Sequence, residues 1–233
     1  TLRQRIFDHY ANSVSVVKTA VSNRTGLLEY FAKAFAAESK KGNETAYLLP
    51  DNPDNYTYDV INMLLQHEVE VERLNSNLEV RGFEYRKGEQ VRRSFQEGDF
   101  LIRADQAKHL FVNTLFRRDL AIEDSVMYDM STWSVPQAYN LDAVWTTSRI
   151  TADASPVVKP LRAESGVENS GAGYAYVVEW SQKNAPKALS HLWKMGYRVR
   201  TAGRTFTYNG VQYSRGSLKI GRASCRERVS FTV

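Results

Sequence analysis

Three side chains in this 233-residue chain have the types and the order of a catalytic zinc site. His67 and Glu70 form a His-x-x-Glu pair, and His191 follows in the second half of the chain. Two histidines and one glutamate can hold Zn²⁺ and leave a fourth position for the water that attacks a substrate. Zinc hydrolysis is therefore the first chemistry that the sequence brings into question.

An internal repeat is the strongest pattern in the chain. Residues 46–49 (Ala-Tyr-Leu-Leu) are similar to residues 175–178 (Ala-Tyr-Val-Val), and in both copies a helical apolar stripe, a second strand and a hairpin follow. Later segments match after small gaps, 83–85 with 206–208 and 98–102 with 216–220. A repeat of this length is a supersecondary unit that buries its helix against neighbouring strands. We therefore predict one α/β body of two similar β-α-β-hairpin units, at residues 45–104 and 174–220.

The repeat argues against the zinc site. In the alignment of the two copies, His67 corresponds to Met195 and His191 corresponds to Met63, so the histidines occupy different positions in separate units. Glu70 alternates with two valines, which turns its carboxylate towards solvent. We expect no metal ligand and no catalytic residue in this chain. The four histidines are expected at helix surfaces or half-buried positions.

The loop of residues 50–55 follows the first strand and is rich in Asp and Asn. Open α/β sheets place ligand sites in loops of this kind, and Asp51, Asn52 and Asp54 are our candidate contacts. The same side chains can accept hydrogen bonds from the free amides at the start of the next helix. Helix capping is the simpler explanation, and both remain open.

Residues 128–136 read Tyr-Asp-Met-Ser-Thr-Trp-Ser-Val-Pro, the most distinctive stretch of the chain. Asp129 can accept hydrogen bonds from the following Ser and Thr, and Trp133 offers a large rigid face. A structural clamp explains the stretch, and so does a contact with a ligand or partner. Asp129 and Trp133 complete our list of candidate contacts.

Helices are expected around the two units. Apolar residues at helical spacing predict two helices within residues 1–42 and a third helix capped by Asp105, with Leu110, Phe111 and Leu115 on one face. Residues 154–173 are rich in Pro, Gly and Ser and are expected to be a connector.

The last thirteen residues, 221–233, resemble a translated sequencing adapter and are expected to be an artefact. Without them the formal charge falls from +5 to +3, because three arginines and one glutamate are removed. They also hold Cys225, so residues 1–220 contain no cysteine for a disulfide or a thiol nucleophile. The small net charge gives no reason to expect nucleic-acid binding, and no apolar run is long enough to span a membrane.

The stretch 128–136 resembles a Tyr-Asp-Val-Thr-x-Trp-Thr-Leu-Pro segment of large secreted bacterial zinc carboxypeptidases, of the carboxypeptidase A type. In those proteins the segment lies downstream of the catalytic domain, after a Gly-Asp-Phe-Leu-Ile strand such as residues 98–102 and a helix. Residues 176–218 are similar to the region that comes next. The resemblance covers most of residues 47–220.

The resemblance implies that residues 43–220 are an accessory domain with a class I glutamine amidotransferase-like, flavodoxin-like fold of three layers. Residues 1–42 would be the helical linker from the peptidase domain, whose metal ligands would lie before Thr1. No catalytic residue carries over, since amidotransferase chemistry needs a cysteine.

The resemblance also sets the functional expectations. Zinc would belong to the parent enzyme, which would be secreted or periplasmic and would release C-terminal amino acids from a peptide substrate. The partner of this chain would be the peptidase domain of the same protein. The alternative is a free-standing module that binds peptide or glycan.

Overall fold

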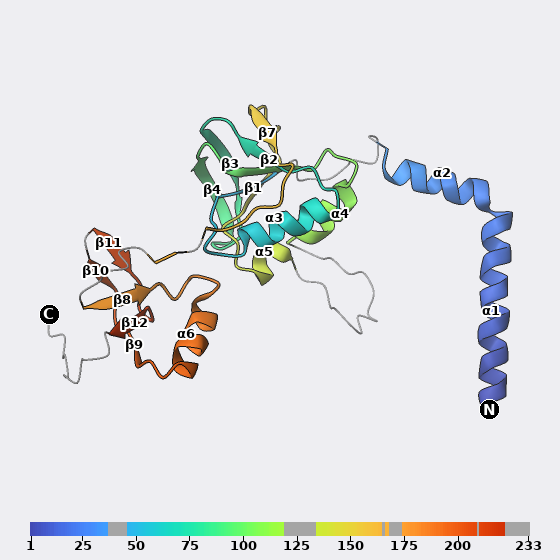
Figure 1. Ribbon diagram of the computed structural model, residues 1–233. Helices are drawn as coiled ribbons and strands as arrows, with labels where there is room; N and C mark the ends of the chain where they lie inside the picture. Colours follow the sequence, from blue (N-terminus) through green and yellow to red (C-terminus); the bar gives the residue numbers. More distant parts are fainter. Residues whose placement is uncertain (37–45, 119–133, 165, 168–173, 209, 222–233) are drawn as a thin grey trace.

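The computed structural model describes residues 1–36, 46–118, 134–164, 166–167, 174–208 and 210–221. Figure 1 shows two helices that extend away from a sheet with helices packed on it, and a smaller second body formed by the C-terminal elements. The two bodies correspond to the two copies of the repeat.

The first unit runs from β1 to β5. It contains β1 (Ala46–Leu49), α3 (Thr57–Gln66), β2 (Glu72–Leu74), the hairpin β3 (Leu78–Glu84) and β4 (Glu89–Phe95), and β5 (Phe100–Arg103). Strand β5 lies between β1 and β2 and pairs antiparallel with both. The helix therefore joins two strands that are separated by the last strand of the same unit.

Four further elements extend the first unit. They are α4 (His109–Phe116), α5 (Val135–Ala138), β6 (Val144–Thr146) and β7 (Ala154–Pro156). The resulting seven-stranded sheet has the order β4-β3-β6-β1-β5-β2-β7. The prediction that residues 154–173 only connect the two units was wrong at its start, because β7 pairs with β2 as an edge strand. Proline is tolerated at an edge, where its missing N–H leaves no ladder partner unpaired.

The second unit repeats the same order of elements. It contains β8 (Ala175–Val178), α6 (Ala185–Lys194), β9 (Val199–Thr201), the hairpin β10 (Phe206–Tyr208) and β11 (Val211–Tyr213), and β12 (Leu218–Gly221). Strand β12 lies between β8 and β9 in a three-stranded sheet. The described part of the chain thus reaches Gly221, the first residue of the expected artefact.

The predicted duplication extends to the strand register. Leu49 lies opposite Phe100 in the first unit, and the matching residues Val178 and Leu218 lie opposite each other in the second. The glycines before the last strands, Gly98 and Gly216, have φ of 91° and 97°, a left-handed conformation that glycine adopts without strain. Two separate sheets that share one register, with a left-handed glycine before the last strand of each unit, indicate a common structural unit.

The expected mixed α/β class is confirmed, but a flavodoxin-like sheet is not. A flavodoxin-like sheet is parallel, whereas every strand pair in the described residues is antiparallel. The reason is the insertion of β5 between β1 and β2, and of β12 between β8 and β9. This arrangement is a split β-α-β unit.

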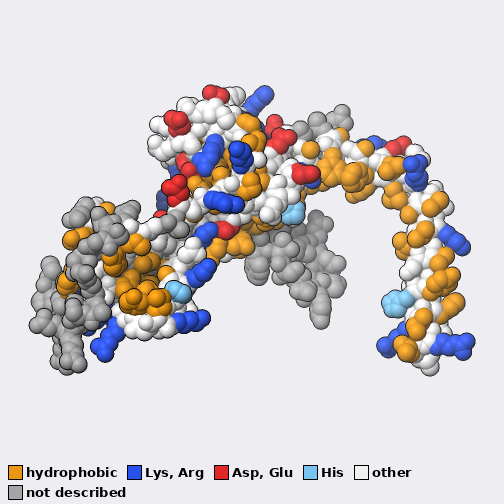
Figure 2. All heavy atoms as spheres, viewed as in Figure 1, with side chains coloured by type: hydrophobic (Ala, Val, Ile, Leu, Met, Phe, Trp, Pro, Cys, Tyr) orange, Lys and Arg blue, Asp and Glu red, His pale blue; other side chains and the backbone are white. Residues whose placement is uncertain are grey.

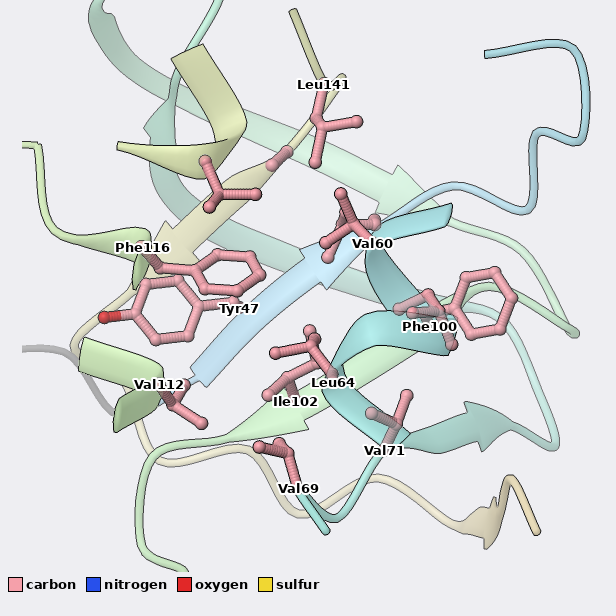
Figure 3. Close-up of a cluster of buried hydrophobic side chains, with 14 of the residues drawn as sticks. Tyr47, Val60, Leu64, Val69, Val71, Phe100, Ile102, Val112, Phe116 and Leu141 are labelled. Atoms are coloured by element: carbon pink, nitrogen blue, oxygen red, sulfur yellow. The ribbon is translucent and has the colours of Figure 1, made fainter. Parts of the chain in front are cut away.

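The core of the first unit has two sides. On one face of the sheet, helices α3 and α4 pack against β1 and β5 around Tyr47, Leu64, Phe100, Val112 and Phe116 (Figure 3). On the other face, Leu48 and Leu101 are covered by residues of β3, β4 and the segment before β7. The described helices thus contribute to one face, and the expectation of three layers with helices on both faces was wrong.

The two N-terminal helices, α1 (Leu2–Ser22) and α2 (Arg24–Ala34), bury none of their residues. Large apolar side chains remain exposed along both, among them Ile6, Phe7, Tyr10, Leu27, Leu28 and Phe31. Figure 2 shows this apolar surface in orange along both helices. None of the helices in the described ranges combines the length and the apolar character that a bilayer crossing requires.

Candidate functional site

The loop after β1 holds three of the candidate contacts. The backbone N–H of Asp51 donates to the buried carboxylate of Asp99, with 2.8 Å between N and Oδ1. The side chain of Asn52 accepts a hydrogen bond from the backbone N–H of Asp54 at 3.0 Å. The side chain of Asn55 accepts from the N–H of Thr57, the first residue of α3. The helix amide is thus accepted by Asn55 and not by one of the three candidate contacts, whereas Asn52 holds the loop itself.

The carboxylate of Asp51 takes part in a polar cluster at the end of β1. Arg73 donates to it through Nη1 at 2.8 Å and to the carbonyl of Gly98 at 2.6 Å. The guanidinium also lies over the ring of Phe100, 4.4 Å from its centre. Burial raises the pKa of the neighbouring Tyr58 hydroxyl, and its hydrogen bond with Asp51 adds to the rise. The arginine thus fills the space between the loop, β2 and β5.

The same loop also lies at the junction of the two units. The backbone N–H of Lys183 donates to the carbonyl of Asp54 at 2.8 Å, and the Lys183 ammonium pairs with Asp59 of α3. Lys183 belongs to the strand-to-helix loop of the second unit, which corresponds to the loop of residues 50–55. Equivalent loops of the two units therefore meet each other.

The second unit has a pocket where the first unit has its arginine. Its volume is about 310 Å³, and it is lined by apolar and polar side chains, including Trp180, Leu189, Thr201, Arg215, Gly216 and Leu218. Trp180 follows β8 by two residues, as Asp51 follows β1. Thr201 has the sheet position of Arg73, since each lies opposite the matching residue of the last strand.

A larger depression lies beside the β3–β4 hairpin, with a volume of about 420 Å³. Two of its cationic side chains already have carboxylate partners. Arg93 forms two hydrogen bonds with Asp142, and Lys87 forms an ion pair with Glu84. The Arg93 hydrogen bonds lower the pKa of the Asp142 carboxyl, although burial opposes them. This surface is a structural network that closes the sheet against the segment before β6.

The considered zinc site is divided between the two units, with His67 and Glu70 in the first and His191 in the second. His67 ends α3 and packs on Phe111, with 4.8 Å between the ring centres, and His191 lies in the last turn of α6. Glu70 is exposed between buried Val69 and Val71, as predicted from their alternation. Within the described ranges, no group of three or more His, Cys, Asp or Glu side chains could hold a metal ion.

His109 differs from the expectation for the histidines. It is the first residue of α4 and only 2% exposed, and neither ring nitrogen has a hydrogen-bond partner in the described part of the chain. The expectation of a surface or half-buried position was wrong here, because the imidazole serves as part of the buried face of α4.

Two candidate contacts, Asp129 and Trp133, lie outside the described residues and stay predictions. Sequence reasoning missed Trp180 and Arg215, although the repeat offered a signal for both. Trp180 has the place of Asp51, and Arg215 corresponds to Glu97, so each replaces an acidic residue of the first unit.

Comparisons with protein-family models, with curated proteins and with solved structures found no match for the chain.

Proposed function

We propose that this chain is a non-catalytic accessory region of a secreted or periplasmic zinc metallocarboxypeptidase, and that it docks on the peptidase domain through α1 and α2. The proposal rests on the resemblance of residues 128–136 and of the second unit to that family. The proposal keeps the family relationship but not the flavodoxin-like fold, because the sheets are antiparallel.

The apolar surface of α1 and α2 is the observation that carries the docking role. Phe31 remains 64% exposed and Ile6 61% exposed, while both helices bury no residue. Each large apolar side chain removed from water contributes about 1.5 to 3 kcal/mol. A pair of helices with such a surface needs a covering partner, and large exposed apolar patches mark protein interaction sites.

The loop of residues 50–55 supports a scaffold role. Its polar groups hold the first unit together and contact the second unit at Lys183. An accessory domain needs such a rigid body behind its docking helices, and the polar cluster around Arg73 supplies it.

Metal content and activity of the isolated chain test the non-catalytic part. We expect no stoichiometric zinc by metal analysis, and no release of C-terminal amino acids from a peptide incubated with zinc and the chain. One tightly bound zinc per chain, together with cleavage, would overturn the proposal.

The docking part is tested in the complete gene. The coding sequence before Thr1 should contain a His-x-x-Glu motif and a later histidine. In the complete protein, Phe31→Asp should expose the junction between peptidase and accessory region to limited proteolysis. Thr25→Asp, which adds the same charge at an exposed polar position of α2, is the matched control. Equal protease resistance of both variants and the parent protein would contradict docking through α2.

The alternative, a free-standing module that binds peptide or glycan, is favoured by one observation. The pocket beside Trp180 is partly apolar and open to solvent, with an exposed indole at its rim. Absence of peptidase motifs from the complete gene would leave this alternative as the better proposal.

A further inference from the structure

The pocket of the second unit lies where the first unit has the side chain of Arg73. In the first unit, the side chain of Arg73 occupies the space above Phe100 and reaches the carbonyl of Gly98. In the second unit the matching residue is Thr201, whose side chain is much shorter. The space above Leu218 is therefore left as a pocket, although the strands around it keep the same register.

The loop beside the pocket also lacks the polar residue that the first unit has there. Where Asp51 binds Arg73, the second unit has Trp180. Its side chain lies beside Gly216, because a Cβ added to that glycine would be 3.7 Å from Cδ1 of the indole. Leu189 of α6 and Leu218 of β12 complete the apolar part. An indole above aliphatic side chains is suited to a flat or branched apolar group.

The charged group at this pocket is Arg215. Its side chain lines the pocket and is exposed, and it forms no hydrogen bond or ion pair within the described residues. The nearby carboxylate of Glu179 is held by the backbone N–H of Ser214 at 3.0 Å and by the Ser217 hydroxyl at 2.8 Å. A guanidinium with free donors binds carboxylates well, often through two parallel hydrogen bonds.

We propose that this pocket binds an apolar group that carries a carboxylate, with an aromatic or branched aliphatic part under Trp180 and the carboxylate on Arg215. Two sources offer this chemistry, a free small carboxylic acid and the C-terminal residue of a peptide. The site is independent of the proposed parent enzyme and needs no metal.

Titration of the full chain with three probes tests the proposal. The probes are 3-phenylpropionate, N-acetylphenylalanine and its uncharged amide, followed through the indole N–H signals of the tryptophans in NMR spectra. We expect one indole signal, lost in Trp180→Phe, to shift and saturate with the acids at about millimolar concentration. The amide should bind about tenfold more weakly, because it cannot form the charge-assisted hydrogen bonds.

Substitutions that rebuild the first unit provide a sharp control. Trp180→Asp with Thr201→Arg introduces the pair that the first unit already accommodates, and it should abolish binding while circular dichroism stays unchanged. Arg215→Glu, which introduces the residue type of position 97, should weaken acid binding at least tenfold. Arg198→Glu, the same charge change at an exposed position outside the pocket, should leave binding unchanged.

The outcomes separate the sources and decide the proposal. Binding of N-acetylphenylalanine identifies a peptide C-terminus as the source, and binding of phenylpropionate alone identifies a free acid. Equal binding of acid and amide, or no shift of the Trp180 signal, would overturn the proposal. If the double variant fails to fold, the Arg215→Glu variant still decides the matter, because unchanged acid binding in that variant would overturn the proposal.

Discussion

The two units share a backbone and differ in how deeply they bury it. All four residues of β1 are buried, because helices cover one face of its sheet and strands cover the other. All four residues of β8 are only half-buried, and the second unit has no described counterpart of α4 or β6. The repeat therefore specifies the strand order and the register, whereas the helices and strands added around a unit determine how deeply its strands are buried.

In both units a carboxylate accepts hydrogen bonds at the turn before the last strand, but it comes from a different position. In the first unit it belongs to the turn itself, and in the second it follows the first strand. In the first unit Asp99, in the turn before β5, accepts from the amides of Gln96 and Asp51. In the second unit Glu179, just after β8, accepts from Ser214 and Ser217, which match Gln96 and Asp99. The matching amides of Gln96 and Ser214 each need an acceptor, and residues at different positions of the two units supply it.

The largest expected difference between the units is in their cores. Leu48→Ala should lower the free energy of unfolding by about 2 to 5 kcal/mol, because it leaves a cavity in a strand buried on both faces. The matching Val177→Ala should cost about 1 kcal/mol, since Val177 is half-buried. Urea unfolding combined with amide hydrogen exchange of β1 and β8 measures both. Equal losses would break the comparison.

Removal of the turn acceptor should have the next largest effect. Asp99→Ala should cost about 2 kcal/mol, because the backbone amides of Asp51 and Gln96 lose a buried acceptor. Glu179→Ala should cost about 1 kcal/mol or less, since its surroundings are more open to water. The same unfolding experiment measures both, and Glu97→Ala, at an exposed position of the same turn, is the control. A larger loss for Glu179→Ala would contradict the burial difference.

The sequence predicted the part of the fold that local patterns encode. The spacing of strands, helices and turns in both units followed from the repeat, and the exposure of Glu70 followed from its alternation with valines. The direction of β5 did not follow, because its insertion between β1 and β2 depends on contacts distant in sequence. The parallel sheet of a flavodoxin-like fold, which the family resemblance implied, is therefore not what the chain forms.

Helix α4 shows a second limit of sequence reasoning. Asp105 was expected as its cap and Leu110 on its apolar face, but Lys108 precedes the first turn and Leu110 is 54% exposed. The buried face holds His109, Val112 and Phe116. Phe111 and Leu115 do pack against the core as partly buried residues, so the prediction missed only the exposure of Leu110 and the burial of His109. The pocket at Trp180 escaped prediction for another reason, since it arises from the absence of an arginine.

Where the backbone is the same in both units, substitutions should cost the same. Gly98→Ala and Gly216→Ala each place a side chain at a φ above 90°, with room for the added carbon. Each should cost about 1 to 2 kcal/mol from backbone strain alone. Thermal unfolding of the two variants measures this. Unequal costs would show that the two turns differ in more than their acceptors.

Acid should destabilise both units, through different carboxylates. Hydrogen bonds from Arg93 hold the pKa of the Asp142 carboxyl below its usual range. Burial raises the pKa of Glu179, but the hydrogen bonds from Ser214 and Ser217 outweigh it and leave it lowered. A lowered folded-state pKa gives stability that is present above the unfolded-state pKa and is lost as the pH falls through the folded-state value.

Asp142→Asn should therefore flatten the acid side of the stability profile below about pH 4 by roughly 1 kcal/mol. Glu179→Gln should flatten it less, because its carboxylate is more exposed and better screened. Urea midpoints measured between neutral pH and acid give the profile. A profile that Asp142→Asn leaves unchanged would show that the Arg93 pair does not control acid stability.

The smallest effect is expected at the junction between the units. Lys183→Gln removes the ion pair with Asp59 but keeps the backbone hydrogen bond to Asp54. Because Asp59 is largely exposed, the loss should be at most about 1 kcal/mol and should diminish further in high salt. Lys187→Gln, at an exposed position of the second unit, is the control. If the backbone contact holds the units together, amide exchange in the first unit stays unchanged in Lys183→Gln, whereas faster exchange throughout β1 would show that the units depend on this one charge.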